Sequence, residues 1–106
     1  EEQTVETMLS NLVQNAIEAS PKGKEVSVHV RRDGENVDFD IHNYGVIPES
    51  VRDRFFERYI TFGKRHGTGL GTYSAWLIAR AHGGTIRFTT DEEEGTHLLV
   101  RLPAGR

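Results

Sequence analysis

The sequence predicts an α+β domain, a two-layer sandwich in which helices cover one face of a mainly antiparallel sheet. Three observations indicate this fold class. Residues 4–20 repeat their apolar side chains with the period of an amphipathic helix. Two pairs of segments alternate apolar and polar residues around a short turn, as β-hairpins do. Two further helical segments lie between these pairs, so the predicted order is α-β-β-α-α-β-β.

Composition limits the chain to one small domain, residues 1–106, of a cytoplasmic protein or of the cytoplasmic part of a longer one. It contains no cysteine, so disulfide bonds cannot stabilise it. Lys and Arg number 13 against 16 Asp and Glu, and this net charge of −3 argues against a nucleic-acid partner. The apolar runs are too short to span a membrane. Because a helical pattern starts almost at Glu1, we expect a fragment.

The first predicted helix ends at Pro21 and Gly23, which interrupt its pattern. The next two segments alternate around Asp33-Gly34, a dipeptide typical of hairpin turns, so we expect a β-hairpin with one buried face. The apolar residues of these segments are Val5, Met8, Leu9, Leu12, Val13, Ala16 and Ile17 in the helix, Val26, Val28 and Val30 in the first strand, and Val37, Phe39 and Ile41 in the second.

A short helix is predicted over residues 49–58, with Val51, Phe55 and Phe56 pointing into the core. A loop with spaced glycines follows over residues 61–71. Residues 72–82 are apolar on most sides and predict a largely buried helix, which ends at Gly83-Gly84. A second hairpin surrounds an acidic turn at residues 91–95, and its alternating apolar residues are Ile86, Phe88, Leu98, Val100 and Leu102.

A polar stripe runs along the first predicted helix. With about 100° per residue, Asn11, Asn15 and Glu18 share one face, away from the apolar stripe. An amide oxygen can bind Mg²⁺ without adding negative charge beside phosphates. The stripe therefore indicates a magnesium and phosphate site, and the alternative is a solvated polar face.

Spaced glycines open the predicted buried helix. Gly67, Gly69 and Gly71 allow backbone N–H groups to approach a phosphate, which the helix N-terminus also favours. Lys64 and Arg65 lie just upstream and add positive charge. The lysine precedes the glycines, so this is not a Walker A loop, and the alternative is a flexible loop.

Asn43-Tyr44-Gly45 follows the end of a predicted strand. The Asn43 side chain offers one hydrogen-bond acceptor and one donor, which could bind a planar base. The alternative is an ordinary strand exit. None of the five histidines has the spacing of a metal-binding pair such as His-x-x-x-His, so zinc chemistry is not expected.

The order of these segments resembles that of the GHKL, or Bergerat-fold, ATPase superfamily over nearly the whole chain. Residues 9–20, with both asparagines of the polar stripe, resemble its N box. Residues 43–48 and 67–71 resemble its two glycine boxes, and residues 51–59 resemble its F box. The resemblance implies a mixed, mainly antiparallel sheet covered on one face by three helices. The short first strand of the family has no counterpart here.

Within this superfamily the chain most resembles the catalytic and ATP-binding domain of sensor histidine kinases of two-component systems. Members that hydrolyse ATP carry a glutamate general base where Asn11 stands, and an amide cannot act as a base. The resemblance therefore implies transfer of the γ-phosphoryl group of ATP to a histidine. Two alternatives remain, a nucleotide-sensing module without kinase activity and a serine kinase of the anti-sigma-factor type.

The resemblance also implies the roles of individual residues. Asn15 would bind Mg²⁺, and Asn11 would support the metal and the phosphates. Asn43 would take the adenine amino group, and Gly45 would allow close approach. Together with Lys64, the two asparagines of the N box would be catalytic. The remaining nucleotide contacts would be Tyr59 at the adenine, Lys64, Arg65 and His66 on the phosphates, and the backbone of Gly67, Thr68, Gly69, Leu70 and Gly71.

Two substitutions depart from the family pattern. Asn43 replaces the usual aspartate, which removes charge from adenine recognition, and Val46-Ile47 replaces the usual second glycine. No histidine is followed by Glu or Asp, so we expect the acceptor histidine on another domain. The implied partners are ATP or ADP, a dimerisation and phosphoacceptor domain of the same protein, and a response regulator. We expect the fragment to be a monomer, without nucleic-acid or direct membrane contact, in the cytoplasm or in the cytoplasmic part of a membrane-bound sensor.

Overall fold

The computed structural model describes residues 4–57 and 71–104. Its elements in chain order are α1 (Val5–Ala19), β1 (Ser27–Asp33), β2 (Asn36–Asn43), α2 (Glu49–Arg52), α3 (Gly71–Ala81), β3 (Thr85–Asp91) and β4 (Gly95–Pro103). The predicted order of helices and strands is therefore confirmed.

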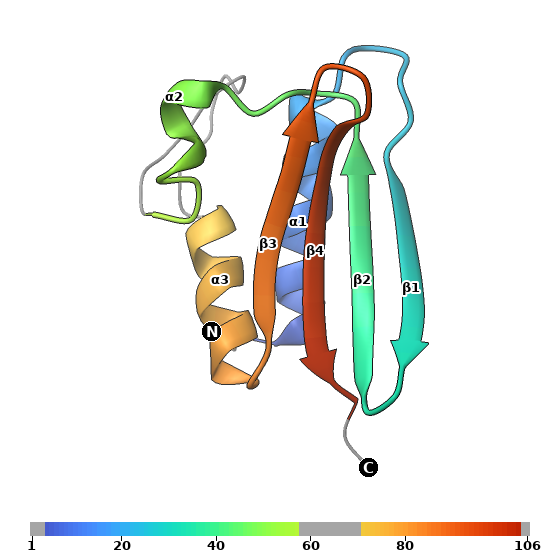
Figure 1. Ribbon diagram of the computed structural model, residues 1–106, viewed down its shortest axis with the longest axis vertical. Coiled ribbons are helices and arrows are strands. Elements are labelled where there is room, and N and C mark those ends of the chain that lie inside the picture. The colour runs from blue at the N-terminus through green and yellow to red at the C-terminus, as the bar shows by residue number, and fades with distance from the viewer. Residues whose placement is uncertain (1–3, 58–70, 105–106) are drawn as a thin grey trace.

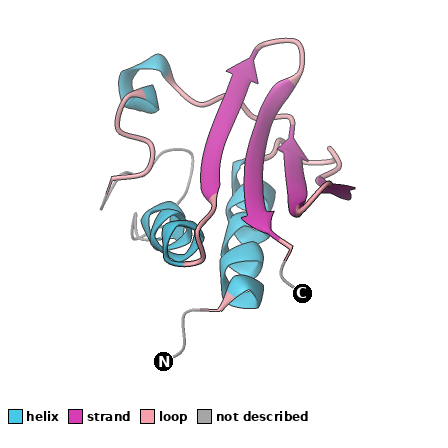
Figure 2. Cartoon of the chain, turned by 60° about the horizontal axis from the view of Figure 1, so that its bottom comes forward, coloured by secondary structure: helices cyan, strands magenta, loops and turns pink. Residues whose placement is uncertain are grey.

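The four strands form one sheet in the order β1-β2-β4-β3 (Figure 1), and all three neighbouring pairs are antiparallel. Helices α1 and α3 lie side by side (Figure 2) and pack on one face of the sheet as a second layer. The α+β two-layer sandwich is thus confirmed. Within residues 4–57 and 71–104 no strand pair is parallel, so the parallel pairing that a mixed sheet requires is not found there.

The core lies between the two layers. On α1, Met8 and Leu12 have no exposed area and Ala16 is buried, whereas Ile17, at the margin of the predicted stripe, is 53% exposed. The helix begins after Thr4, whose hydroxyl accepts a hydrogen bond from the Thr7 N–H at 3.0 Å. The other buried apolar residues are Ile41, Ile47, Phe55, Ala75, Ile78, Ala79, Ile86, Leu98, Val100 and Leu102.

Helix α2 is shorter than the predicted helix over residues 49–58. After Arg52 the chain continues in tight turns, in which the N–H groups of Phe55 and Glu57 bond the carbonyls three residues earlier. The Phe55 carbonyl then accepts a hydrogen bond from the Thr72 hydroxyl at 3.2 Å, and the Phe55 ring meets Phe88 at 5.0 Å between ring centroids. These tertiary contacts accompany the early end of the helix, and α1 and α3 are the helices that pack on the sheet within the described residues.

Strand β1 does not have the buried face that its alternation predicts. Val28 is 43% exposed and Val30 is 61% exposed, although their partners Ile41 and Phe39 on β2 contribute to the core. The sheet order explains this difference, because β1 is an edge strand that lies beyond the helical layer. The burial of a strand therefore depends on what covers it as well as on its pattern.

Helix α3 ends in a Schellman motif. Gly83 has φ of 78°, and the N–H of Gly84 bonds the Ala79 carbonyl at 2.8 Å. The helix buries one side rather than most sides, because Leu77 is 43% exposed. No helix within the described parts of the chain is long and apolar enough to cross a membrane.

Candidate functional site

The structure describes five of the predicted ligand-binding residues. They are Asn11 and Asn15 on α1, Asn43 and Gly45 at the end of β2, and Gly71 at the start of α3. The other predicted contacts lie outside the described residues and are Tyr59, Lys64, Arg65, His66, Gly67, Thr68, Gly69 and Leu70.

One amide of the N box, that of Asn15, lies beside Gly71 at the end of the second glycine box. Asn11 and Asn15 lie one helical turn apart on α1, and both are partly exposed. A Cβ atom at Gly71 would lie 3.0 Å from Asn15 Nδ2 and 3.4 Å from its Oδ1. The glycine therefore allows the N-terminus of α3, which carries partial positive charge, to approach an oxygen-bearing side chain. A helix N-terminus beside an amide oxygen suits a phosphate together with a hard cation such as Mg²⁺.

Asn43 is buried at the end of β2, with 4% of its surface exposed. Its Nδ2 atom has no hydrogen-bond partner among the residues that the structure describes. A buried donor without a partner costs about 1–3 kcal/mol, so this amide is suited to a ligand that brings an acceptor. The edge of adenine presents an acceptor beside an amino group, which a carboxamide can match with two hydrogen bonds.

Gly45 permits a close contact within the protein rather than with a ligand alone. A Cβ atom at this position would lie 2.3 Å from the Ala19 carbonyl oxygen and 2.9 Å from Asn43 Nδ2. The missing side chain therefore lets the segment after β2 cross the C-terminal end of α1. A larger residue at this position would overlap both the Ala19 carbonyl and the Asn43 amide.

Two threonines that the sequence did not single out hold this segment on the sheet. Thr96 on β4 pairs with Asn43 in the strand register, and its hydroxyl donates to the Gly45 carbonyl at 2.8 Å. Thr90 on β3 donates to Thr96 Oγ1 at 2.8 Å and accepts from the Ile47 N–H at 3.0 Å. In the sequence, the two threonines are marked only by their position beside the acidic turn. Their contacts could not be predicted, because they depend on the register of the strands.

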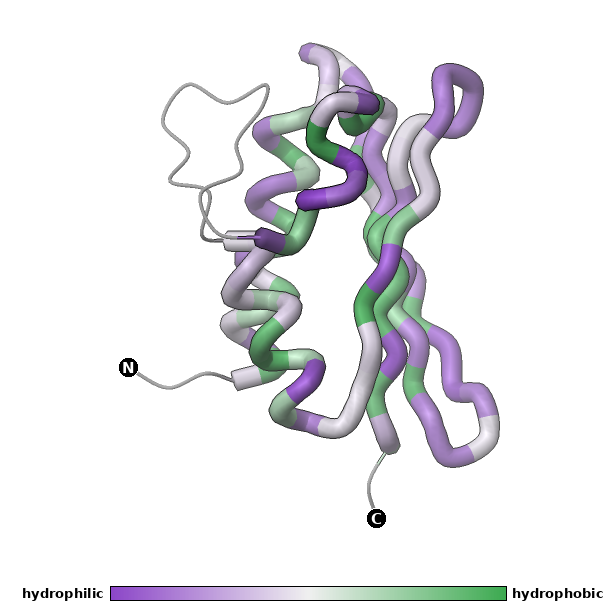
Figure 3. Tube along the Cα trace, turned by 60° about the vertical axis from the view of Figure 1, so that its left-hand side comes forward, coloured by the Kyte–Doolittle hydropathy of each residue, from purple (hydrophilic) through white to green (hydrophobic). Residues whose placement is uncertain are grey.

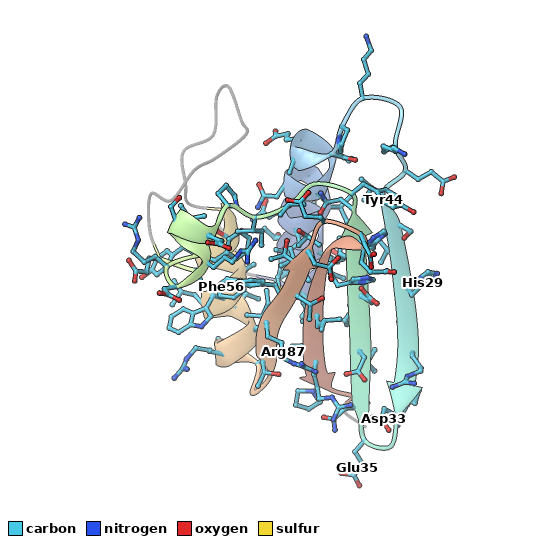
Figure 4. The ribbon with its side chains drawn as sticks, turned by 45° about the horizontal axis from the view of Figure 1, so that its top comes forward. His29, Asp33, Glu35, Tyr44, Phe56 and Arg87 are labelled. Carbon is cyan, nitrogen blue, oxygen red and sulfur yellow. The ribbon has the colours of Figure 1, made fainter. Side chains whose placement is uncertain are left out.

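The phenylalanines of the F-box-like segment are packing residues. Phe55 meets both Phe56 and Phe88 edge to face with ring centroids 5.0 Å apart, and it is buried. Tyr44 (Figure 4), in contrast, is 44% exposed at the end of β2. The Lys24 ammonium lies 5.4 Å from the centre of its ring.

Comparison with known proteins gives a consistent result. Residues 1–106 match the family described as histidine kinase-, DNA gyrase B- and HSP90-like ATPases. The sensor-like histidine kinase SenX3 of Mycobacterium tuberculosis is 37% identical over 105 residues, which cover 92% of this chain and 25% of that protein. Sporulation kinase B of Bacillus subtilis is 34% identical over 96 residues, which cover 89% of this chain and 22% of that protein.

The fold agrees with solved structures of the same kind. The catalytic domain of histidine kinase ThkA superimposes with a TM-score of 0.81 at 30% identity, covering 94% of this chain and 67% of that one. The chain spans about a quarter of the length of the curated relatives that it matches.

Proposed function

The chain belongs to the family of histidine kinase-, DNA gyrase B- and HSP90-like ATPases, and on this basis we propose that it is the ATP-binding catalytic domain of a sensor histidine kinase. Residues 1–106 would form this domain in the cytoplasm. In the intact protein, the domain would pass the γ-phosphoryl group of ATP to a histidine on a dimerisation domain, from which a response regulator would receive it.

The buried Asn43 amide is the observation that carries the nucleotide assignment. Its Oδ1 would accept from the adenine amino group, and its Nδ2, which lacks a partner among the described residues, would donate to the adjacent ring nitrogen. The hydroxyls of Thr90 and Thr96 support this proposal, because they fix the backbone that follows Asn43 through the Gly45 carbonyl and the Ile47 N–H.

The phosphates would lie between α1 and the start of α3. Asn15 would supply an oxygen ligand to Mg²⁺, and the absence of a side chain at Gly71 lets the N-terminus of α3 lie beside this amide. Mg²⁺, when bound, would neutralise charge on the phosphate oxygens. The amide of Asn11 cannot act as a general base, so it cannot activate a water molecule for attack on ATP. This favours transfer of the phosphoryl group to a histidine of another domain. Lys64, Arg65 and His66 stay predicted phosphate contacts.

Calorimetry with Mg·ADP tests the nucleotide site, and we expect binding in the micromolar to millimolar range that is typical of substrates. Absence of binding at millimolar nucleotide would refute the proposal. A second assay adds a dimerisation domain with an acceptor histidine and radiolabelled ATP. Acid-labile label on that domain is the expected result. Nucleotide binding without any label would instead favour the nucleotide-sensing module.

A further inference from the structure

The face of the sheet opposite the helices carries a histidine cluster that the proposed function does not use. Ile41 and Leu98 point into the core, so their neighbours Asp40, His42 and His97 point to the other face. No helix among the described residues covers that face (Figure 3). Side chains there are accessible to a small ligand from solvent.

His42 and His97 are direct partners in the register of β2 and β4, and their ring centroids lie 4.4 Å apart. Glu94, from the turn between β3 and β4, places its Oε1 at 3.8 Å from His97 Nε2. One ligand atom from each of these three residues lies within 4.8 Å of the other two. Three donor atoms at this separation can converge on one ion after small side-chain rotations, because metal–ligand bonds of about 2 Å place ligands some 3–4 Å apart.

In each imidazole, one ring nitrogen forms a hydrogen bond within the protein. His97 Nδ1–H donates to Asp40 Oδ1 at 2.8 Å, and His42 Nε2–H donates to the Glu94 carbonyl oxygen at 2.5 Å. The second nitrogen of each ring then keeps its lone pair. Histidines that bind metals almost always donate their other N–H to a carboxylate or a backbone carbonyl in this way.

The turn that carries Glu94 is itself fixed. Asp91 Oδ1 accepts hydrogen bonds from the N–H groups of Glu93 at 2.9 Å and of Glu94 at 2.7 Å. Gly95 follows with φ of 81° and packs against the Asn43 carbonyl. The third donor therefore comes from an ordered backbone, which lowers the entropy that metal binding must overcome.

We propose that His42, Glu94 and His97 form a binding site for a divalent transition-metal ion of the Zn²⁺ type. Two imidazoles and one carboxylate suit Zn²⁺ and leave its fourth position to water, whereas Mg²⁺ prefers oxygen ligands throughout. The site is separate from the nucleotide site, because His42 and Asn43 are adjacent on β2 and point to opposite faces. It therefore does not depend on the proposed kinase function.

Titration of the chain with ZnCl₂ alone, followed by calorimetry, tests the proposal. We expect one ion per chain in the unmodified protein, and an affinity at least about tenfold weaker in each of the variants His42→Gln, His97→Gln and Glu94→Gln. Asp40→Asn, which removes only the carboxylate that orients His97, should weaken binding by about 10- to 100-fold. Circular dichroism establishes that each variant is folded.

The matched control is His29→Gln, because His29 is exposed on β1 of the same sheet (Figure 4) and lies outside the cluster. This variant should bind Zn²⁺ like the unmodified chain. CoCl₂ supplies a second readout, since bound Co²⁺ in a four-coordinate site of nitrogen and oxygen ligands absorbs visible light more strongly than the hydrated ion. Equal Zn²⁺ affinity in the unmodified chain and the cluster variants, or equal loss in His29→Gln, would overturn the proposal.

Discussion

In the proposed nucleotide site, two asparagine side chains would determine what is recognised. Asn43 is buried, and its amide donor has no partner among residues 4–57 and 71–104, which suits a flat heterocycle with a complementary edge. Asn15 lies beside Gly71 and offers a neutral oxygen near a helix N-terminus, which suits a phosphate-bound cation. Because an amide carries no charge, both residues would act through their geometry, and a small displacement of either side chain should weaken nucleotide binding.

Replacement of Asn43 by alanine should reduce the affinity for ADP by about tenfold, which corresponds to about 1.4 kcal/mol. The affinity for GDP, whose base edge presents the opposite pattern of donors and acceptors, should change little. Calorimetry with both nucleotides measures the difference. Asn36→Ala, at the other end of β2, is the control, and an equal loss in both variants would contradict the base-reading role.

Replacement of Asn15 by alanine should remove the part of ADP affinity that depends on magnesium. Binding measured in EDTA should stay close to that of the unmodified chain, because the base contacts are retained. The control is Gln14→Ala, whose exposed side chain donates to Glu18 at 3.1 Å. If magnesium strengthens binding equally in Asn15→Ala and Gln14→Ala, Asn15 is not a metal ligand.

At the scale of elements, the hairpin of β3 and β4 positions the end of β2. Thr90 and Thr96 hold the segment that follows Asn43, and Gly95 packs against the backbone of the same residue. A Cβ atom at Gly95 would lie 2.2 Å from the Asn43 carbonyl oxygen. Gly95 thus connects a surface turn to the end of β2, where the proposed nucleotide site lies.

Substitution of Gly95 by alanine should therefore destabilise the domain by at least about 3 kcal/mol, because a positive φ and a backbone overlap act together. Gly34→Ala is the matched control. Its φ is 64°, and nothing lies within 4 Å of the added Cβ, so it should cost only about 1–2 kcal/mol. Urea unfolding of both variants measures the two losses. Similar values would show that the contact with Asn43 adds nothing.

Across the whole molecule, one charge cluster links three strands on the uncovered face of the sheet. Arg101 on β4 bonds both carboxylate oxygens of Asp38 on β2, at 2.7 and 2.9 Å, and it also bonds Asp33 on β1. The hydrogen bonds from Arg101 hold the pKa of Asp38 below its ordinary value, and they raise the pKa of Arg101. The edge strand β1, which buries few apolar side chains, is thus also held by charge.

The lowered pKa of Asp38 predicts the pH dependence of stability. A carboxylate whose folded pKa is depressed contributes fully above its unfolded pKa of about 3.9, and the contribution is lost as pH falls through the folded value. Asp38→Asn should therefore be less stable than the unmodified chain at pH 7, and the difference should shrink in acid.

Urea unfolding at pH 7 and in acid measures the difference in stability between Asp38→Asn and the unmodified chain. The control is Glu35→Gln at the exposed turn between β1 and β2, for which the described residues show no ion pair (Figure 4). A difference between Asp38→Asn and the unmodified chain that persists undiminished in acid would refute the assignment.

The sequence alone determined the order of the elements and the family, because both depend on local patterns. Apolar periodicity set α1 and the two hairpins, and the spacing of Asn11, Asn15, Asn43 and the glycines indicated a nucleotide site. Predictions from the sequence were wrong where the burial of a residue depends on neighbours that are distant in the chain. Alternation in β1 could not reveal that the strand lies beyond the helices, and the pattern after Arg52 could not reveal the Thr72 hydrogen bond that accompanies the end of α2.

Only the tertiary structure decided which residues meet across the sheet. Antiparallel register pairs His42 with His97 and Asn43 with Thr96, although each pair is more than 50 residues apart in the chain. Spacing along the sequence therefore could not reveal that His42, Glu94 and His97 come together from two strands and a turn. The physical reason is that hydrophobic patterns specify which face of an element is buried, whereas sheet register and glycine contacts determine which polar atoms lie side by side.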